Sequence, residues 1–414
     1  MGKINKLILK IVGGRYNVAT WISFGLFFYL VLYFSYKGIT TSPATLGHDI
    51  DSIVYHIPIA QNLAKGNFLP PDLRHGLGYY PAVGESILAV FIILGIPLNL
   101  FNVLGLFVLF IVSRILAQRF GLNNLYSTVF AASVASLNSV TRLVNNQTID
   151  VWLVIFYLLC LYLLIKPQKK ISYFLLLGIS FGLLIGVKYS GIVFAAVLAL
   201  FFFRNVIRKL NIARFLALGI PIIIFGFSWY IRNYALTGNP IYPGSVFGFE
   251  KHPDFITQGW YPIQTLFYYP GAIVLIITAL ISEYLIWMIT LILPFLIIYL
   301  DKLRSLNIDK NIKLLSFLGI ANFAVFFFLP SNPGAIVSDV RYLFPSLIPL
   351  MLASFLLAKK FNKLPEISTI AILSASAVLP QFEFRPKLAF IWLTIMSGVF
   401  IYINFLKHRL KPKL

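Results

Sequence analysis

The sequence is poor in the residues on which soluble and secreted proteins depend. It contains one cysteine, Cys160, so a disulfide framework and a cysteine-ligated metal site are both excluded. Charged residues make up 11% of the 414 residues, whereas a soluble domain contains about 25%. Hydrophobic residues make up 59%, and the mean hydropathy is +0.87. These values exclude an ordinary soluble domain.

Acidic residues are especially scarce, with 13 Asp and Glu against 34 Lys and Arg and a net charge of +21. In a soluble protein this excess would suggest a nucleic-acid partner. In a membrane protein it is explained by basic cytoplasmic loops and by contact with anionic lipid head groups. We therefore expect membrane lipids, and no nucleic acid, among the partners.

Repeated apolar stretches of roughly 16 to 20 residues indicate a polytopic, all-α membrane protein. The first stretch, Asn17 to Tyr36, is too long for a signal peptide and is expected to be an uncleaved span. No separate soluble domain is visible, so residues 1–414 are expected to form one integral membrane domain. About 12 spans are predicted, with both termini in the cytoplasm: 17–36, 99–117, 123–140, 149–165, 171–186, 189–203, 214–231, 282–300, 314–330, 343–358, 367–380 and 388–405.

Two further apolar stretches, 82–97 and 266–281, either span the membrane or lie in its interface. If neither spans, the cytoplasmic segments hold 24 Lys and Arg and the outer segments hold 10; if both span, the split is 19 to 15. The positive-inside rule favours the first arrangement. It predicts a multi-pass protein of the cell membrane with these charged residues on the outer face: Asp49, Asp51, Asp150, Lys188, Arg232, Asp339 and Arg341.

Two long loops are expected on this outer face, residues 37–81 and residues 232–265. The first contains Ile53, Ile57, Ala60 and Leu63 at helical spacing. Such an amphipathic helix is expected to lie flat on the membrane.

Three carboxylates are the leading candidates for chemistry, because charge at the mouth of a membrane span is costly. Asp49 and Asp51 follow the first apolar stretch, and Asp150 opens a later one. A carboxylate at the edge of a low-dielectric site suits a general base. Asp51 shares a helix face with Tyr55 and is the first candidate, and Asp49 could share or replace its role. The alternative for each carboxylate is a helix cap.

Several short fragments follow one another over about 300 residues. They are DSIVYHIP (51–58), LAKG (63–66), YYP (79–81), TID (148–150), GVKYSG (186–191), WYIRNY (229–234) with TGNPIYP (237–243), and RYLFP (341–345). In this order they resemble GT-C type glycosyltransferases, a superfamily that includes protein O-mannosyltransferases and lipid A aminoarabinose transferases. The Glu-Lys that precedes the Tyr-x-Pro segment in aminoarabinose transferases is absent, since Gly78 to Pro81 stands there and Glu85 follows. This argues against that substrate.

The resemblance implies a GT-C-like bundle that transfers a sugar from a polyprenyl-phosphate-linked donor to a protein, lipid or glycan acceptor. The reaction would invert the anomeric carbon, with Asp51 as the base and Asp49 or Asp150 assisting. The resemblance also implies that cations hold the lipid phosphate. The candidates for binding the donor are Lys188, Arg341, Arg232, Tyr55 and His56.

Each of these residues also has a purely structural interpretation. Lys188 and Arg232 could extend to the membrane interface, and Arg341 could pair with Asp339. His56 could form hydrogen bonds within its loop.

A divalent cation is left open as a cofactor. His48, His56 and His75 lie near the aspartates of the first loop, but their spacing matches no specific zinc pattern.

The main alternative function is a transporter or flippase of lipid-linked or small polar substrates. That class requires polar residues deep within several spans and repeated broken helices. Charges gathered at one membrane face, and the lack of an internal repeat, favour the transferase. A second alternative is a non-catalytic assembly protein or a ligase-like protein.

Overall fold

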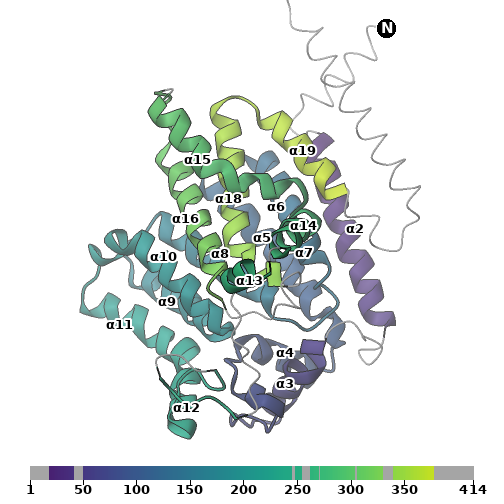
Figure 1. Cartoon of the computed structure of the whole chain (residues 1–414), viewed down its shortest axis with the longest axis vertical. Coiled ribbons are helices and arrows are strands. Elements are labelled where there is room, and N and C mark those ends of the chain that lie inside the picture. The colour runs from purple at the N-terminus through teal and green to yellow at the C-terminus, as the bar shows by residue number, and fades with distance from the viewer. Residues whose placement is uncertain are drawn as a thin grey trace, which may run out of the picture.

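A computed structural model describes residues 18–41, 50–244, 248–253, 262–269, 271–303, 305–329 and 339–376. These residues form helices and connecting turns and contain no β-strand (Figure 1). The expected all-α class is therefore confirmed. Asp49, His48 and the predicted span 388–405 lie outside the described residues, as does the end of the span 367–380.

The α-helices follow one another along the chain with short 3₁₀ and π-helical turns between them. Their bounds are α2 Val18–Thr40, α3 Ile57–Ala64, α4 Val83–Ile93, α5 Phe101–Arg119, α6 Asn124–Ala135, α7 Asn138–Thr141, α8 Asp150–Ile165, α9 Ile171–Val187, α10 Tyr189–Ile207, α11 Ile212–Pro221, α12 Ser228–Thr237, α13 Pro262–Tyr268, α14 Ala272–Tyr284, α15 Leu293–Ile298, α16 Lys310–Phe326, α18 Phe344–Lys360 and α19 Leu364–Ser376.

Six helical stretches within the described residues are long and apolar enough to cross a membrane. Four shorter apolar helices accompany them, among them α8 and α9. A multi-pass membrane protein is thus confirmed, while the total of 12 spans stays a prediction. The six stretches are Thr20–Thr40, Leu98–Arg119, Tyr189–Ile207, Ile212–Thr237, Ala272–Lys302 and Val340–Lys360.

The two ambiguous segments are not independent full-length spans. Helix α4 has 11 residues, a length of about 16 Å, and a hydrocarbon core is about 30 Å thick. Helix α14 belongs to the longer stretch Ala272–Lys302 and ends where Leu285 adopts a positive φ of 52°. This change of direction separates α14 from the part of the stretch that follows. The arrangement in which neither segment spans stays a prediction.

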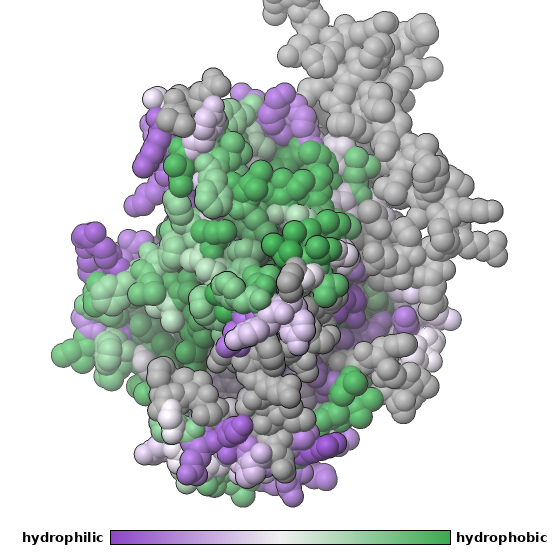
Figure 2. Space-filling model, in the orientation of Figure 1, coloured by the Kyte–Doolittle hydropathy of each residue, from purple (hydrophilic) through white to green (hydrophobic). Residues whose placement is uncertain are grey.

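On the face shown in Figure 2, hydrophobic side chains form a broad belt across the middle, and hydrophilic residues gather toward the top and bottom. Inside the belt, α5, α6, α8 and α18 are largely buried. Helix α8 is apolar all round, as expected of a helix enclosed by others. The buried Asn322 of α16 donates to the Tyr157 hydroxyl of α8 at 2.7 Å and to the Pro345 carbonyl of α18 at 3.0 Å. This polar contact joins three helices in the core.

Helix α9 packs very closely against α11 and the π-helical turn Ile222–Phe227, because three glycines recur every four residues. A Cβ atom on Gly178, Gly182 or Gly186 would lie 2.3 Å, 2.6 Å or 2.1 Å from the carbonyl oxygens of Leu218, Pro221 and Phe225, respectively. Small residues at this spacing allow membrane helices to bring their backbones together. The contact fixes the end of α9, where Lys188 follows.

The amphipathic helix expected in the first outer loop is α3. Ala60 is fully buried, and Ile57 and Leu63 pack against the core. Helix α3 lies against α4 (Figure 1). The apolar face is therefore covered by protein at Ile57, Ala60 and Leu63, whereas Ile53 is 49% exposed. That this helix lies flat on the membrane stays a prediction.

Candidate active site

Four charged residues from distant parts of the sequence meet at one end of the helix bundle. Asp51 precedes the π-helical turn Ser52–His56, and Asp150 is the first residue of α8. Lys188 stands between α9 and α10. Arg341 lies in the 3₁₀ turn Val340–Leu343, directly before α18. Each is at a helix end, so alternating helix directions bring them together.

The four side chains form one connected ion-pair cluster. Nζ of Lys188 lies 2.9 Å from Oδ1 of Asp150, and Nε of Arg341 lies 3.5 Å from Oδ2 of the same carboxylate. Nη2 of Arg341 donates to Oδ2 of Asp51 at 3.0 Å. The Asp150 side chain is 4% exposed and the Asp51 side chain 38%. Asp150 is therefore enclosed between two cations, whereas Asp51 is partly exposed.

Local backbone geometry places Lys188 in this cluster. The residue is extended, with φ −164° and ψ 152°, so it breaks the helical path between α9 and α10. The chain then turns back tightly, because a Cβ on Gly191 would lie 1.9 Å from the Leu184 carbonyl oxygen. A glycine is required there, and the lysine is held at the turn.

Neither the Asp51 side chain nor the Asp150 side chain forms a helix-capping hydrogen bond. Asp51 has helical backbone angles and no side-chain capping bond, and the residue that caps α8 is Ile149. The capping interpretation of these two carboxylates is therefore wrong.

Tyr342 supports both cations of the cluster and was not singled out by the sequence analysis. Nζ of Lys188 lies 4.4 Å from its ring centroid, and Cζ of Arg341 lies 5.5 Å away. These distances are typical of cation–π contacts. Tyr342 does fall in the RYLFP fragment, and that fragment was the available signal.

Asn102 of α5 is a second residue that the sequence analysis missed. Its fully buried amide donates to the carbonyls of Leu143, Asn146 and Thr148 at 3.2, 3.1 and 2.7 Å. It thereby shapes the segment that leads into Asp150. A polar residue within an apolar span was the signal, since such residues are seldom without a role.

Tyrosines line the first-loop side of the cluster. The Tyr55 and Tyr80 rings contact each other at a centroid distance of 5.4 Å, and Tyr80 contacts Tyr189 at 5.6 Å. Burial, and secondarily the negative charge of Asp51, raises the pKa of Tyr55 well above its usual value. Burial also raises the pKa of Tyr80. Both phenols therefore stay neutral at physiological pH.

His56 and Glu85 form a buried pair beside these tyrosines. Nδ1 of His56 lies 2.7 Å from Oε1 of Glu85, and the two side chains are 1% and 0% exposed. The Glu85 carboxylate sits in the first turn of α4. The pair thus links the turn that follows Asp51 to α4. Ser52 ties the same turn to the segment before Asp150, since its Oγ accepts from the backbone N–H of Gln147 at 2.9 Å.

Arg232 contacts a different set of groups. Its guanidinium donates to the Tyr79 carbonyl at 3.0 Å and to Oδ1 of Asn233 at 2.9 Å. The Asn233 amide donates to the same Tyr79 carbonyl at 2.8 Å and to the Tyr189 hydroxyl at 3.0 Å. Arg232 and Asn233 therefore join the two outer loops. Donor binding by Arg232 stays a prediction.

Hydrogen bonds within the second outer loop hold its conformation. Gly238 adopts a positive φ of 72° at the end of α12. The Asn239 amide then donates to the carbonyls of Gly244 and Glu250 at 2.7 and 2.8 Å. The TGNP fragment therefore shapes the loop beside the site.

The part of the chain that the structure describes contains no group of three or more His, Cys, Asp or Glu side chains that could hold a metal ion. His48 and Asp49, two of the first-loop candidates, lie outside it.

No protein-family model matches the chain, and no curated protein matches it. Two solved structures are similar to it. ArnT from Cupriavidus metallidurans bound to undecaprenyl phosphate matches with a TM-score of 0.50 and 16% identity, over 93% of this chain and 70% of that chain. The apo state of the same protein matches with a TM-score of 0.46 and 15% identity, over 80% of this chain and 60% of that chain.

The chain thus spans 60–70% of the length of the ArnT structures. At these identities the likeness concerns the fold. The GT-C-like bundle that the sequence fragments predicted is confirmed at that level, and the chain has an ArnT-like polytopic helical membrane fold.

Proposed function

We propose that the chain is a membrane glycosyltransferase that moves a sugar from a polyprenyl-phosphate-linked donor to an acceptor on the outer face of the cell membrane. The observation that carries this proposal is the cluster in which Lys188 and Arg341 enclose Asp150 while Asp51 stays accessible. The likeness in fold to a protein that binds undecaprenyl phosphate supports a lipid-phosphate partner.

Asp51 is the candidate base. It is the more exposed carboxylate and has one ion-pair partner, so an acceptor can approach it. In the proposed step Asp51 takes the proton of an acceptor hydroxyl or amide, and the acceptor atom bonds to the anomeric carbon. The bond from that carbon to the phosphate oxygen breaks, and the polyprenyl phosphate leaves with the electron pair. A single displacement of this kind inverts the anomeric carbon.

Lys188 and Arg341 are the candidate phosphate ligands. Cations aimed at a leaving phosphate stabilise the charge that develops on it, and an arginine can contact phosphate through two N–H groups. Asp150 keeps the two cations close together and in fixed positions. Because two cations stabilise its ionised form, it is a weaker candidate for the base, and we assign it an orienting role.

A small apolar cavity offers a place for the first part of the lipid chain. It has a volume of about 310 Å³ and lies between α10 and α16. Val193, on its wall, is in the second turn of α10, close in sequence to Lys188. The remaining lining residues are Ala321, Ala324, Val325, Phe328 and Leu329.

The proposed orientation rests on the basic residues at the other end of the bundle. Arg119 ends α5, Lys166 follows α8, and Lys359 and Lys360 end α18, all at the helix ends opposite the cluster. Basic ends face the cytoplasm. The Asp51–Arg341 cluster then faces outward.

The test is sugar transfer by the purified chain in detergent with a panel of polyprenyl-phosphate sugars. Wild type is compared with Asp51→Asn, which keeps the shape but removes the base. We expect release of polyprenyl phosphate by wild type and a loss of roughly 100-fold or more in the variant. Asp72→Asn is the matched control, because Asp72 is an exposed carboxylate in the same outer loop.

Two outcomes would count against this proposal. If Asp51→Asn retains activity, the base is another carboxylate, with Asp49 and Asp150 next in order. If wild type binds the donors without turning any over, the transporter or flippase alternative is favoured.

A further inference from the structure

A second polar region lies at the end of the bundle opposite the ion-pair cluster. Helix α18 starts just after Arg341 and runs for 17 residues to Lys360, a length of about 25 Å. Helix α16 packs beside it and starts at Lys310. Where α16 begins and α18 ends, a cavity of about 700 Å³ opens between them.

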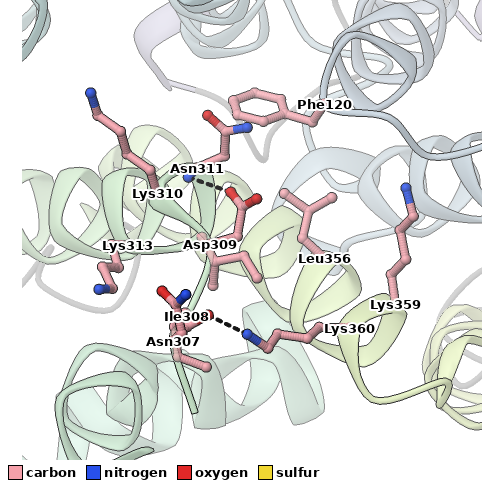
Figure 3. Close-up of a pocket in the computed structure, with 11 residues that line it drawn as sticks. Phe120, Asn307, Ile308, Asp309, Lys310, Asn311, Lys313, Leu356, Lys359 and Lys360 are labelled. Atoms are coloured by element: carbon pink, nitrogen blue, oxygen red, sulfur yellow. Dashed lines mark hydrogen bonds between the residues drawn. The ribbon is translucent and has the colours of Figure 1, made fainter. Parts of the chain in front are cut away.

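The walls of this cavity combine lysines with apolar side chains. Lys310 and Lys313 come from α16, and Lys359 and Lys360 from the end of α18, so the four ammonium groups stand on two sides of Leu356 (Figure 3). Phe120, Ile308, Ile312 and Leu356 supply the apolar part of the wall and are each buried.

The lysines of the cavity wall have more N–H donors than the acidic side chains around them can accept. Asp309 is the one acidic residue of the lining, and its carboxylate caps α16 by accepting from the backbone N–H of Asn311 at 2.7 Å. Lys313 pairs with Asp301 at 2.5 Å. Within the described part of the chain Lys310 has no hydrogen-bond or ion-pair partner.

Lys359 and Lys360 are positioned but not neutralised by their contacts. Lys359 donates to the Gly121 carbonyl at 2.6 Å. Lys360 donates to the carbonyl of Leu306 at 2.7 Å and to that of Asn307. A carbonyl takes one proton from an ammonium group, which has three. Both lysines therefore keep positive charge and free N–H groups at the cavity wall.

We propose that this cavity binds the phosphate-bearing head group of an anionic membrane lipid. The ammonium groups match the charge of a phosphate, and the apolar residues beside them match the upper part of acyl chains. The cavity also lies at the basic end of the bundle, where anionic lipid head groups gather in the cytoplasmic leaflet. A bound lipid would hold α16, α18 and the segment before α16 together, and so stabilise the scaffold that carries Arg341.

The test uses the full chain, purified in detergent and stripped of lipid. Its thermal unfolding midpoint is titrated with phosphatidylglycerol, with phosphatidylcholine and with glycerol phosphate, because a ligand that binds only the folded state raises the midpoint. The test variant is Lys310→Gln/Lys359→Gln. The matched control is Lys169→Gln/Lys170→Gln, which removes two exposed lysines at the same end of the bundle, outside the cavity. The charge-retaining variant is Lys310→Arg/Lys359→Arg.

We expect phosphatidylglycerol to raise the midpoint more than phosphatidylcholine does. Its apparent affinity should fall roughly 30-fold in Lys310→Gln/Lys359→Gln, and persist in the control and the arginine variant. An equal fall in the control would reduce the effect to general surface charge and overturn the proposal. If glycerol phosphate alone raised the unfolding midpoint as much as phosphatidylglycerol does, the ligand would be a soluble phosphate, and the lipid proposal would be overturned. Because the readout is stability, the result does not depend on sugar transfer.

Discussion

Arg341 and Asp51 are 290 positions apart in the sequence, yet Nη2 of the arginine donates to Oδ2 of the aspartate at 3.0 Å. This bond ties the first outer loop to the start of α18. Arg341 also contacts Asp150, so it joins the accessible carboxylate to the enclosed one. Any change at Arg341 is therefore expected to affect both the shape of the site and its charge.

The first prediction concerns Arg341 itself. Arg341→Gln removes one of two cations from the almost fully buried Asp150. Loss of one partner of a buried ion pair costs about 3–5 kcal/mol. We expect a lower unfolding midpoint and no measurable transfer. Arg341→Lys keeps the charge but cannot contact Asp51 and Asp150 with a planar fork, so it should recover stability more than turnover. If Arg341→Lys recovered stability and turnover equally, the positive charge at this position would be sufficient for both.

The second prediction concerns coupling between Lys188 and Asp150. Lys188→Met and Asp150→Asn each leave a buried charged partner behind. The double variant removes both charges together, so its loss of stability should be smaller than the sum of the two single losses by about 1 kcal/mol or more. The measurement is the free energy of unfolding, in denaturant or by heating, of wild type, the two single variants and the double variant. Additive losses would mean that the 2.9 Å contact contributes little.

The third prediction separates the aromatic ring of Tyr342 from its hydroxyl. Tyr342→Phe keeps the face that Lys188 and Arg341 contact, and its turnover is expected to stay within about threefold of wild type. Tyr342→Leu removes the cation–π contacts and should lower turnover roughly 10-fold. Donor titrations of both variants are the measurement. A Phe variant as impaired as the Leu variant would assign the role to the hydroxyl.

The fourth prediction tests the close approach of α9 and α11. A side chain at Gly182 meets the Pro221 carbonyl oxygen, 2.6 Å from its Cβ position. Gly182→Val is expected to lower the unfolding midpoint strongly, because backbone atoms would have to move apart. Gly219→Ala is the control on the facing helix, since nothing lies within 4 Å of its Cβ position. Similar midpoints for the two variants would contradict the packing described above.

The sequence alone determined the class of the protein and supplied the charged candidates for its site. An apolar chain with few charges must cross a membrane, and each charge at a span end must find a partner. For this reason Asp51, Asp150, Lys188 and Arg341 could be chosen before any contact was known. The fold resemblance could also be read from fragments that surround these residues.

The tertiary structure alone decided how these residues are paired. Hydrophobic periodicity describes one helix at a time, whereas the partners of Asp150 come from the end of α9 and the start of α18. Local pattern equally allowed helix capping by Asp51 and Asp150, yet neither side chain forms a capping hydrogen bond. The contacts of Tyr342, the His56–Glu85 pair and the lysine-lined cavity also depend on which helix ends meet. Side-chain pairing across the bundle is a property of packing, and packing is set by the whole chain rather than by any one segment.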